Sequence, residues 1–543
     1  MKEKDTLKWI YKRCNRGFWN MALLVFLSSW SAVCITGFAM LSKNVIDSAQ
    51  QGDKDALIRH SLFLVLLIAS QMIARVAYSI LVAVNCGRAE MNLKTFVFSN
   101  VLRNKYDFTT KFHSGEIMTR LTSDVNVVSQ NAVELVPRAL MYGVRILSAA
   151  IALIIIDRRF ALIFICCGVL IGLFAAILRK PLKKFHNEVQ QKDENVRSYL
   201  QEMTENLFAV KIFRIYDKVL ARAETVQKKL YKSQLKRSVF STGVNIGFSL
   251  LFGVSFACAV AYGSNGILKG TMSFGSVVAL IQLVNQIGGP IAGVTGIIPS
   301  FFAMTTSAQR LMEISVDNKS KKETIVRYND FEEIKGEGIK FAYDDEIVLN
   351  NFDFSIKKGE FIGVQGQSGT GKTTLLKLIT GLYTPSDGKI TIETTNGSLP
   401  CDNVKGLFSF VPQGNMLFSG SIRENLTLLS KNATDDEIEN ALKIACADFV
   451  YSLDGKLDFV LAENGGGISE GQAQRIAIAR AILSKNKFIL MDEATSALDS
   501  ETEEKLLDNL KSLKEYTILF ISHKENVIKN CDRIISITKS NKM

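Results

Sequence analysis

The chain has 543 residues, which is too long for a single hydrophobic core, so at least two domains are expected. Hydrophobic residues make up 47% of the chain and charged residues 22%, which excludes a protein made only of lipid-embedded helices. The 65 Lys and Arg against 53 Asp and Glu leave a net charge of +12, which suits either nucleic acid or an anionic membrane surface as a partner. The nine cysteines form no CxxC pair and no Cys/His cluster, which argues against a disulfide scaffold or a zinc site.

Six long apolar runs lie before residue 315, and none follows residue 330. An α-helix needs about 20 apolar residues to cross roughly 30 Å of hydrocarbon, so the runs predict membrane spans rather than buried helices of a soluble protein. The predicted spans are about 18–41, 62–84, 139–156, 160–178, 244–262 and 277–302.

Basic residues predict the orientation of these spans. The tail before the first span and the segment 179–240 are rich in Lys and Arg, whereas the short connection at 157–159 has only two. By the positive-inside rule, both termini and the two long connections, about 85–138 and 179–240, lie in the cytoplasm. The positive charge therefore follows membrane topology, and nucleic acid is not expected as a partner. Apolar residues recur at helical spacing in 181–239, which predicts a helical hairpin there.

Strands and helices alternate beyond a polar linker at 316–334, which predicts an α/β domain at 335–543. Within it, residues 366–373 match the pattern GxxxxGK[ST], after an apolar strand and before a helix. In this context the glycines let backbone N–H groups surround phosphates at a helix N-terminus. Lys372 would then contact the β- and γ-phosphates, and Thr373 would offer its hydroxyl to Mg²⁺.

A second acidic element follows the apolar strand at 488–491. Asp492 and Glu493 stand at its carboxyl end, where ligands of α/β sheets bind. Asp492 suits a Mg²⁺ ligand, and Glu493 is placed to polarise an attacking water.

With these motifs in this order, the sequence resembles the ATP-binding cassette (ABC) transporter family over nearly its whole length. Residues 468–472, Ile-Ser-Glu-Gly-Gln, are similar to the family's signature motif, and 496–499 to its D-loop. Gln413 resembles the Q-loop glutamine, His523 the switch histidine, and Glu463 the acidic residue just before the signature in exporters. The resemblance implies a half-transporter of the exporter type. Its fold would be that of a multidomain membrane protein, with an all-α six-helix transmembrane domain at 1–315 and an α/β P-loop NTPase domain at 335–543.

The resemblance also implies ATP and Mg²⁺ as cofactors. The implied catalytic residues are Glu493, His523 and Gln413, and the implied Mg²⁺ ligands are Thr373, Gln413 and Asp492. The implied ATP-binding residues are Tyr343, Gly366, Gln367, Ser368, Gly369, Thr370, Gly371, Lys372, Thr373, Thr374, Ser469, Gly471, Gln472 and Asp499. Residues 114–124 and 202–213 resemble the cytoplasmic connections whose short tip helices dock on the nucleotide domains.

Two residues of the cassette leave alternatives open. Tyr343 either stacks on adenine or packs with Phe341 along a strand. Glu470 stands where the family's signature usually has Gly. Its carboxylate either points away from the phosphates or marks one partner of an unequal pair.

Polar residues inside the spans leave alternatives open as well. Arg75 and Arg145 interrupt apolar runs, so they contact either a substrate or partners within the helix bundle. The sixth span contains further residues that either line a cavity or bond between helices. These are Gln282, Asn285, Gln286 and Pro290.

The sequence thus predicts ATP-driven export of an amphipathic substrate (a drug-like compound, a lipid or a peptide) by alternating access in a dimer. A second copy of the chain is the expected partner, with a different half-transporter as the alternative. The expected location is the plasma membrane, here the bacterial inner membrane, with the cassette in the cytoplasm. Two other functions remain open: import of a small chelate on the same fold, and a non-transporting, ATP-gated regulator or channel.

Overall fold

The computed structural model describes most of the chain, and it divides into two compact units. The described residues are 3–14, 18–112, 114–315, 326–327, 330–343, 346–367, 369–395, 397–401, 404–414, 416–462 and 465–538. Unit 1 comprises Met1–Leu102 with His113–Val316, and unit 2 comprises Arg103–Phe112 with Asp317–Met543. A segment of ten residues from the predicted first cytoplasmic connection therefore belongs with the C-terminal unit.

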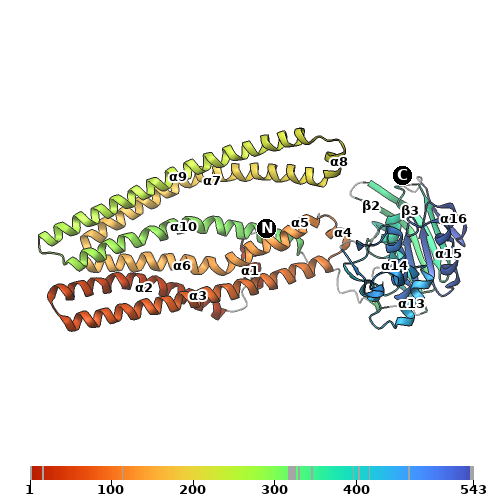
Figure 1. The fold of residues 1–543 in the computed structure, drawn as a ribbon, viewed down its shortest axis with the longest axis horizontal. Helices are drawn as coiled ribbons and strands as arrows, with labels where there is room; N and C mark the ends of the chain where they lie inside the picture. The colour runs from red at the N-terminus through yellow and green to blue at the C-terminus, as the bar shows by residue number, and fades with distance from the viewer. Residues whose placement is uncertain are drawn as a thin grey trace. The chain divides into compact units, whose positions relative to one another are not determined.

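The described part of unit 1 is helical (Figure 1). Its helices are α1 Glu3–Cys14, α2 Phe18–Gln51, α3 Lys54–Arg103, α5 Ser114–Thr119, α6 Val125–Ile156, α7 Arg158–Glu205, α8 Leu207–Ile212, α9 Tyr216–Leu268 and α10 Phe274–Ile314. One π-helical turn, Arg120–Asp124, joins α5 to α6. Helices α7 and α9 run side by side with α8 at their turn, so the helical hairpin predicted for 181–239 is present.

Four helical segments are long and apolar enough to cross a membrane, by length and composition. They are Trp19–Gln51, Lys54–Arg103, Ser114–Ile156 and Tyr216–Leu268, and they contain the first, second, third and fifth predicted spans. The other two predicted spans lie in α7 and α10, which are 48 and 41 residues long and include positions whose side chains are outside the described set. The count of six spans therefore stays a prediction.

Helix α10 packs against α2 and α6 to form the core of unit 1. Small side chains let the backbones approach there, because Ala39, Ala149 and Ala279 are completely buried. Gln286 of α10 is also buried, and its amide Nε2 donates to the carbonyl oxygen of Ile35 in α2 at 2.8 Å. Of the two alternatives predicted for Gln286, lining a cavity or bonding between helices, the structure shows the hydrogen bond between helices.

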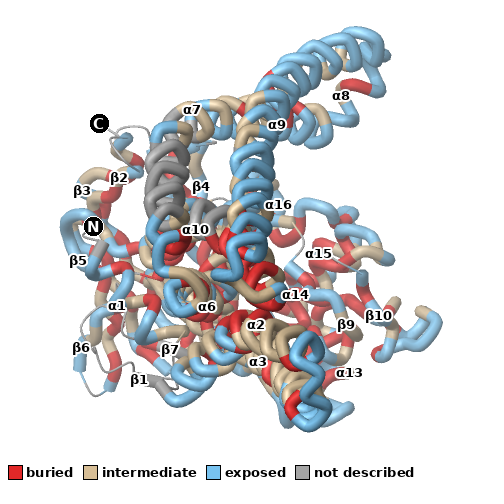
Figure 2. Tube along the Cα trace, turned by 90° about the vertical axis from the view of Figure 1, so that its left-hand side faces the viewer, coloured by how far each residue is buried: buried red, intermediate tan, exposed pale blue. Residues whose placement is uncertain are grey.

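By contrast, α3 and α9 leave their apolar side chains largely uncovered (Figure 2). Only 6% of the most apolar stretch of each helix is buried. An uncovered apolar surface of this length is stable in hydrocarbon but costly in water. Both helices therefore have the surface of membrane-embedded segments.

Unit 2 is built on two sheets. The parallel sheet has the strand order β13–β4–β12–β11–β8, and the antiparallel sheet has the order β3–β2–β5–β6. The parallel strands are β4 Phe361–Gly366, β8 Phe408–Val411, β11 Phe488–Asp492, β12 Thr517–Ile521 and β13 Arg533–Ile537. The antiparallel strands are β2 Glu333–Tyr343, β3 Glu346–Lys357, β5 Asp387–Thr394 and β6 Gly397–Pro400. Two short pairs add β1 Val326–Arg327 with β7 Val404–Lys405, and β9 Gly420–Ser421 with β10 Val460–Leu461. Strand β1 thus lies inside the segment predicted as a linker.

The helices of unit 2 are α4 Tyr106–Thr109, α11 Lys372–Ile379, α12 Ile422–Thr427, α13 Asp435–Ile444, α14 Glu470–Leu483, α15 Ser500–Ser512 and α16 Glu525–Lys529. One hydrophobic core fills the space between the two sheets and α11, and a second joins the parallel sheet to α13, α14 and α15. Strands β11 and β12 are buried at every position, as expected for parallel strands covered on both faces. All five parallel strands end at the same edge of the sheet, and that edge carries the predicted site.

Candidate functional site

The loop between β4 and α11 has the backbone that the glycine pattern predicts. Gly369 and Gly371 have φ angles of +77° and +101°, in the left-handed region that favours glycine. A Cβ atom on Gly371 would lie 2.7 Å from Val348 Cγ1, and one on Gly366 would lie 2.6 Å from the carbonyl oxygen of Ile537. The loop therefore tolerates no side chain at these positions. Ser368 lies outside the described residues.

Lys372, the first residue of α11, places its ammonium group inside this loop. Its Nζ donates to the carbonyl oxygens of Gly366 at 2.8 Å and Gln367 at 3.0 Å. Burial lowers the pKa of Lys372, and the carboxylates of Glu493 and Asp492 oppose that shift. The two carbonyl oxygens carry only partial negative charge. A phosphate bound in the loop would give the Lys372 ammonium a full negative charge to pair with.

Asp492 and Thr373 form a pair of oxygen donors beside Lys372. Burial raises the pKa of Asp492, while a hydrogen bond with the Thr373 side chain lowers it. A divalent cation would relieve the cost of holding this carboxylate ionised in a buried site. The described residues contain no cluster of three or more metal-binding His, Cys, Asp or Glu side chains. One carboxylate and one hydroxyl suit Mg²⁺, which keeps waters and takes its other ligands from phosphates.

Glu493 stands next to Asp492 and contacts two other predicted catalytic residues. Its Oε2 accepts a hydrogen bond from Gln413 Nε2 at 2.7 Å, and its Oε1 lies 3.5 Å from His523 Nε2. The three residues follow β11, β8 and β12, which are adjacent strands, so the sheet brings together positions up to 110 residues apart. Glu493 also has a φ of +50°, a strained value for a residue with a side chain. A carboxylate held in this way can orient a water and accept its proton.

Tyr343, at the end of β2, has contacts that support both predicted roles. Its hydroxyl lies 3.3 Å from Thr374 Oγ1, at the start of α11. Its ring meets Phe341 edge-on, with the ring centroids 5.0 Å apart. The residue is still 38% exposed, so surface remains for a planar ligand to stack on.

Sequence reasoning missed an aromatic contact behind Tyr343. The buried Tyr383 meets the Tyr343 ring at 5.6 Å and the ring of Tyr106 in α4 at 5.7 Å. Lys377 Nζ lies 5.6 Å from the Tyr383 ring centroid and 6.0 Å from that of Tyr106. The predicted nucleotide site and the segment Arg103–Phe112 are thus joined through one side chain. No local sequence pattern around Tyr383 predicts these ring contacts, because its partners are far away in the chain.

The signature residues form the N-terminus of α14. Ser469 caps the helix by accepting from Gln472 N at 3.3 Å, and Gln472 Oε1 accepts from Ser469 N at 2.9 Å. Gly471 packs so tightly that a Cβ atom there would lie 2.7 Å from the carbonyl oxygen of Ala497. Glu470 is exposed at the first helical position, where a carboxylate is favoured by the helix dipole. Glu463 lies outside the described residues.

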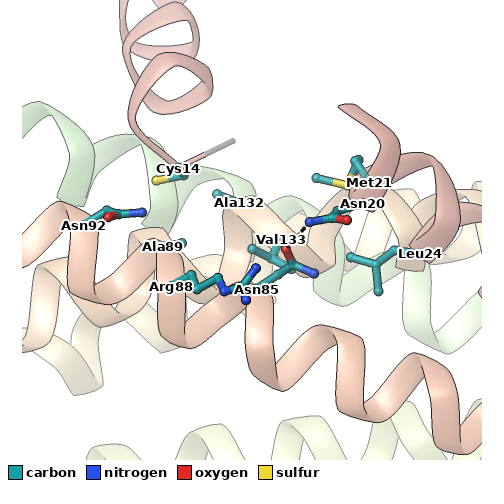
Figure 3. A pocket seen from close by; sticks show the side chains of 10 residues that line it. All are labelled: Cys14, Asn20, Met21, Leu24, Asn85, Arg88, Ala89, Asn92, Ala132 and Val133. Atoms are coloured by element: carbon teal, nitrogen blue, oxygen red, sulfur yellow. Dashed lines mark hydrogen bonds between the residues drawn. The ribbon is translucent and has the colours of Figure 1, made fainter. Parts of the chain in front are cut away.

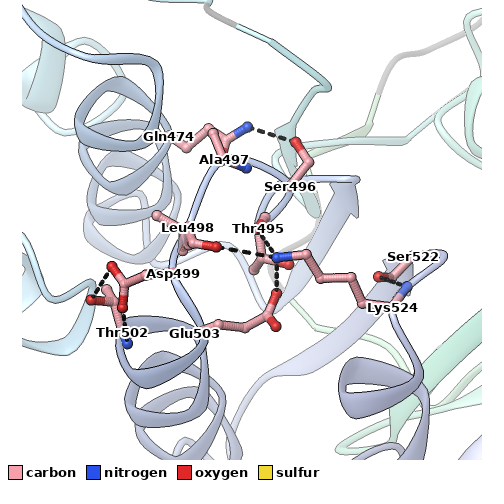
Figure 4. Close-up of polar contacts among 10 residues, drawn as sticks. All are labelled: Gln474, Thr495, Ser496, Ala497, Leu498, Asp499, Thr502, Glu503, Ser522 and Lys524. Atoms are coloured by element: carbon pink, nitrogen blue, oxygen red, sulfur yellow. Dashed lines mark hydrogen bonds and ion pairs between the residues drawn. The ribbon is translucent and has the colours of Figure 1, made fainter.

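The turn at 496–499 is held by hydrogen bonds from two side chains, Gln474 and Lys524 (Figure 4). Gln474 of α14 donates to Ser496 Oγ at 3.1 Å and accepts from Ala497 N at 3.3 Å. From the other side, Lys524 Nζ donates to the carbonyl oxygen of Leu498 at 3.3 Å.

Lys524 also bonds the carbonyl oxygen of Thr495 at 2.8 Å and the buried carboxylate of Glu503 at 2.9 Å. Asp499 caps α15 by accepting from Thr502 N at 2.8 Å, and this hydrogen bond lowers the pKa of Asp499. Lys524 was not singled out from the sequence, although it directly follows His523.

The predicted ATP-binding residues therefore fall into two groups. The described residues among 366–374 lie with Asp492 and Glu493 at the ends of the parallel strands, and Tyr343, at the end of the antiparallel strand β2, lies beside Thr374. Ser469, Gly471, Gln472 and Asp499 lie around the N-termini of α14 and α15. Within the described part of the chain, no hydrogen bond or ion pair joins Ser469, Gly471 or Gln472 to residues 366–374.

Comparison with known proteins gives two family matches. The family described as ABC transporter transmembrane region matches residues 21–291, and the family described as ABC transporter matches 349–496. The chain is 31% identical over 454 residues to the uncharacterized ABC transporter ATP-binding protein YfiB of Bacillus subtilis, covering 81% of this chain and 77% of YfiB. It is 27% identical to the ATP-dependent lipid A-core flippase of Syntrophus aciditrophicus, covering 83% and 76% of the two chains.

Longer relatives also match. The chain is 33% identical over 69% of its length to the leukotoxin export ATP-binding protein LtxB of Aggregatibacter actinomycetemcomitans, and it spans 53% of LtxB. It spans between 30% and 52% of several others. Both family regions occur here in one chain, with the transmembrane region first. The chain therefore belongs to the ABC transporter family, as a half-transporter of the exporter type with one helical membrane region fused to one α/β nucleotide-binding cassette.

Proposed function

We propose that two copies of this chain form an exporter that uses ATP binding and hydrolysis to move an amphipathic substrate across a membrane. One observation carries the proposal: the Gln413–Glu493–His523 group and the phosphate loop share one sheet edge, while the described signature residues at the N-terminus of α14 make no hydrogen bond or ion pair with that loop. A site that needs both groups closes only when two cassettes face each other. A two-fold dimer would form two such sites at once.

In this site the residues of the chain would act as follows. Backbone N–H groups of 366–373 and the ammonium of Lys372 would bind the phosphates, and the exposed Tyr343 ring would stack on adenine. Glu493 would orient the attacking water and take its proton, with Gln413 and His523 holding the carboxylate. Thr373, Asp492 and Gln413 would hold Mg²⁺, which neutralises charge on the β- and γ-phosphate oxygens when bound.

The dimer is further supported by the exposed tip of the second cytoplasmic hairpin. Phe208 in α8 and Phe213 directly after it are 78% and 70% exposed. Two exposed phenylalanines at one turn indicate a docking surface. We propose that this tip contacts the cassette of the second copy, so that closure of the two cassettes moves the membrane helices.

Glu493→Gln tests the hydrolytic part of the proposal. In the reconstituted full chain it should lower the ATPase rate by about 100-fold or more while leaving ATP bound, because it removes the base but not the phosphate contacts. Glu501→Gln, an exposed residue of α15, is the matched control and should keep the ATPase rate. An unchanged rate in Glu493→Gln would refute the role assigned to this carboxylate.

The substrate proposal is a lipid or a peptide. The relatives named lipid A-core flippase and leukotoxin export protein support these two classes. Transport by inside-out vesicles would support export, and transport only by right-side-out vesicles would support an importer. A regulator would hydrolyse ATP without moving any compound in either kind of vesicle.

We also propose that the protein is a multi-pass component of a bacterial inner membrane, with the cassette and both termini in the cytoplasm. The distribution of Lys and Arg supports this orientation.

A further inference from the structure

Two adjoining cavities, both partly open to the surface, lie in unit 1 beside the N-terminal helix α1. The first has a volume of about 260 Å³ and is lined by side chains of α1, α2, α3 and α6 (Figure 3). The second has a volume of about 540 Å³ and is lined by α1, α2, α6 and α10. Cys14, Met21 and Ala132 line both. Their sizes are close to the roughly 300–1,000 Å³ of small-molecule pockets.

The first cavity is polar and carries a positive charge. Asn85, Arg88 and Asn92 line it from one face of α3, because spacings of three and four residues place side chains in a row along a helix. Asn20 of α2 faces them, and its amide donates to Asn85 Oδ1 at 3.4 Å. None of the described residues that line either cavity is acidic.

Arg88 has no acidic partner within ion-pair distance in the described part of the chain. The acidic residues on the neighbouring turns are paired elsewhere: Glu90 with Lys94 at 2.6 Å, and Glu134 with Arg138. An arginine without a counter-charge that lines a cavity together with three amide side chains can donate to a phosphate oxygen there.

A second cation lies close to the same cavity. The Arg13 guanidinium sits 3.6 Å above the ring centroid of Phe96, which follows Asn92 by one helical turn. Its Nε is buried and has no hydrogen-bond partner among the described residues. Arg13 directly precedes Cys14, which lines both cavities. Arg88 therefore lines the polar cavity itself, and Arg13, whose Nε is unpaired among the described residues, directly precedes one of its lining residues.

The second cavity is almost entirely apolar. Ile10 and Tyr11 of α1 face Val25 of α2, Leu135 of α6 and Phe301 of α10 across it. Helix α1 thus forms one wall of the apolar cavity, and its last residue, Cys14, lines the polar one as well. An alkyl chain would fill this space without leaving a polar group unpaired.

The position along the chain matches the depth of lipid headgroups. Asn85, Arg88 and Asn92 directly follow the predicted span 62–84, and Asn20 stands at the beginning of the span 18–41. Basic pockets at this level between membrane helices suit anionic headgroups.

We propose that the two cavities together bind an anionic amphiphile, with a phosphate-type headgroup beside Arg88 and one alkyl chain in the apolar cavity next to α1. The ligand is either a phospholipid of the bilayer or the transported compound, since both can share this chemistry. The proposal goes beyond the ATP-driven cycle and does not depend on it.

Binding of radiolabelled dodecyl phosphate to the full chain in phosphatidylcholine nanodiscs tests this site, with empty nanodiscs as the blank. Arg88→Gln should weaken binding about tenfold, because it removes a charge-assisted hydrogen bond. Arg59→Gln is the matched control, since Arg59 is an exposed arginine of the same helix that lines neither cavity. Ala132→Leu, which narrows the junction of the cavities, should weaken binding of dodecyl phosphate and of the neutral dodecanol alike. Arg88→Gln should leave dodecanol binding unchanged.

Equal effects of Arg88→Gln and Arg59→Gln, or unchanged binding in Ala132→Leu, would overturn the proposal. Addition of ATP with Mg²⁺ separates the two sources of the ligand. A transported compound should leave the site in the wild type but not in Gly371→Ala, whose phosphate loop has no room for ATP, whereas a resident phospholipid should stay bound in both.

Discussion

Replacing Lys524 should both destabilise the cassette and slow ATP hydrolysis. Its ammonium group lies 2.9 Å from Glu503, whose side chain is only 4% exposed, and it bonds two backbone carbonyls of the turn at 495–498. Removing one partner of a buried ion pair typically costs about 3–5 kcal/mol, because the other charge is left uncompensated. Lys524 is itself 37% exposed, so water offsets part of this cost, and we expect about 2–3 kcal/mol for Lys524→Met.

A double variant isolates this effect. Lys524→Met with Glu503→Leu removes both charges, so it should be more stable than Lys524→Met alone. The assay is thermal inactivation of the full chain, followed by the residual ATPase rate. For a domain of this size, 2–3 kcal/mol corresponds to a shift in the midpoint of about 5–10 °C.

Lys529→Met serves as the control, since Lys529 forms an ion pair with Glu525 in which both side chains are at least 75% exposed. An unchanged midpoint in Lys524→Met, or a double variant no more stable than Lys524→Met, would refute the reasoning.

Three further changes probe the same cassette. Gly371→Ala should abolish ATP binding, measured by equilibrium dialysis, because the left-handed backbone and a contact of 2.7 Å with Val348 leave no room for a Cβ atom. Asp492→Asn should raise the thermal stability of the nucleotide-free protein and abolish Mg²⁺-dependent hydrolysis. Burial raises the pKa of Asp492, so ionising this carboxyl in the folded protein costs stability once the pH rises above 3.8, its usual pKa. The stability gained by Asp492→Asn should therefore be large at neutral pH. It should vanish near pH 3, where the carboxyl is protonated in the folded and the unfolded protein alike. Tyr383→Leu should leave ATP binding within about twofold but lower the substrate-stimulated part of the ATPase rate, because it breaks the contact between Tyr343 and Tyr106. Equal losses of basal and stimulated rates would contradict that last role.

Much of the cassette could be predicted from the sequence because its chemistry follows short, local patterns. The glycine spacing of the phosphate loop, and the apolar strand before Asp492 and Glu493, are each readable within ten residues. The fold then places both at one sheet edge, since parallel strands that share a sheet end together. Gln413, Glu493 and His523 meet at that edge, and Ser469 and Asp499 cap α14 and α15. Their roles in ATP binding and hydrolysis stay predictions.

What could not be predicted are contacts between residues far apart in the sequence. Lys524 and Glu503 are 21 residues apart on different elements, and Tyr106 and Tyr383 are 277 apart. Neither pair has a local signature, because the packing of several elements decides which side chains meet.

The length of the membrane helices is also something that the sequence pattern did not predict. Hydropathy ended the second span at about residue 84, yet α3 continues as one helix to Arg103. A helix keeps its internal hydrogen bonds when it leaves the membrane, so the apolar pattern marks the span and not the end of the helix.

The most direct test of the central claim is whether ATP retention by one copy requires the signature of another. The Glu493→Gln protein, given ATP and Mg²⁺ and passed over a gel-filtration column, should retain about one ATP per chain. Adding Ser469→Asp should abolish this retention, because the new carboxylate keeps the helix cap but repels the phosphates. Ser469→Asn, which keeps the cap without the charge, should retain ATP. If the Ser469→Asp protein retains ATP at the same stoichiometry, the nucleotide is held within one cassette and the proposed dimeric site is wrong.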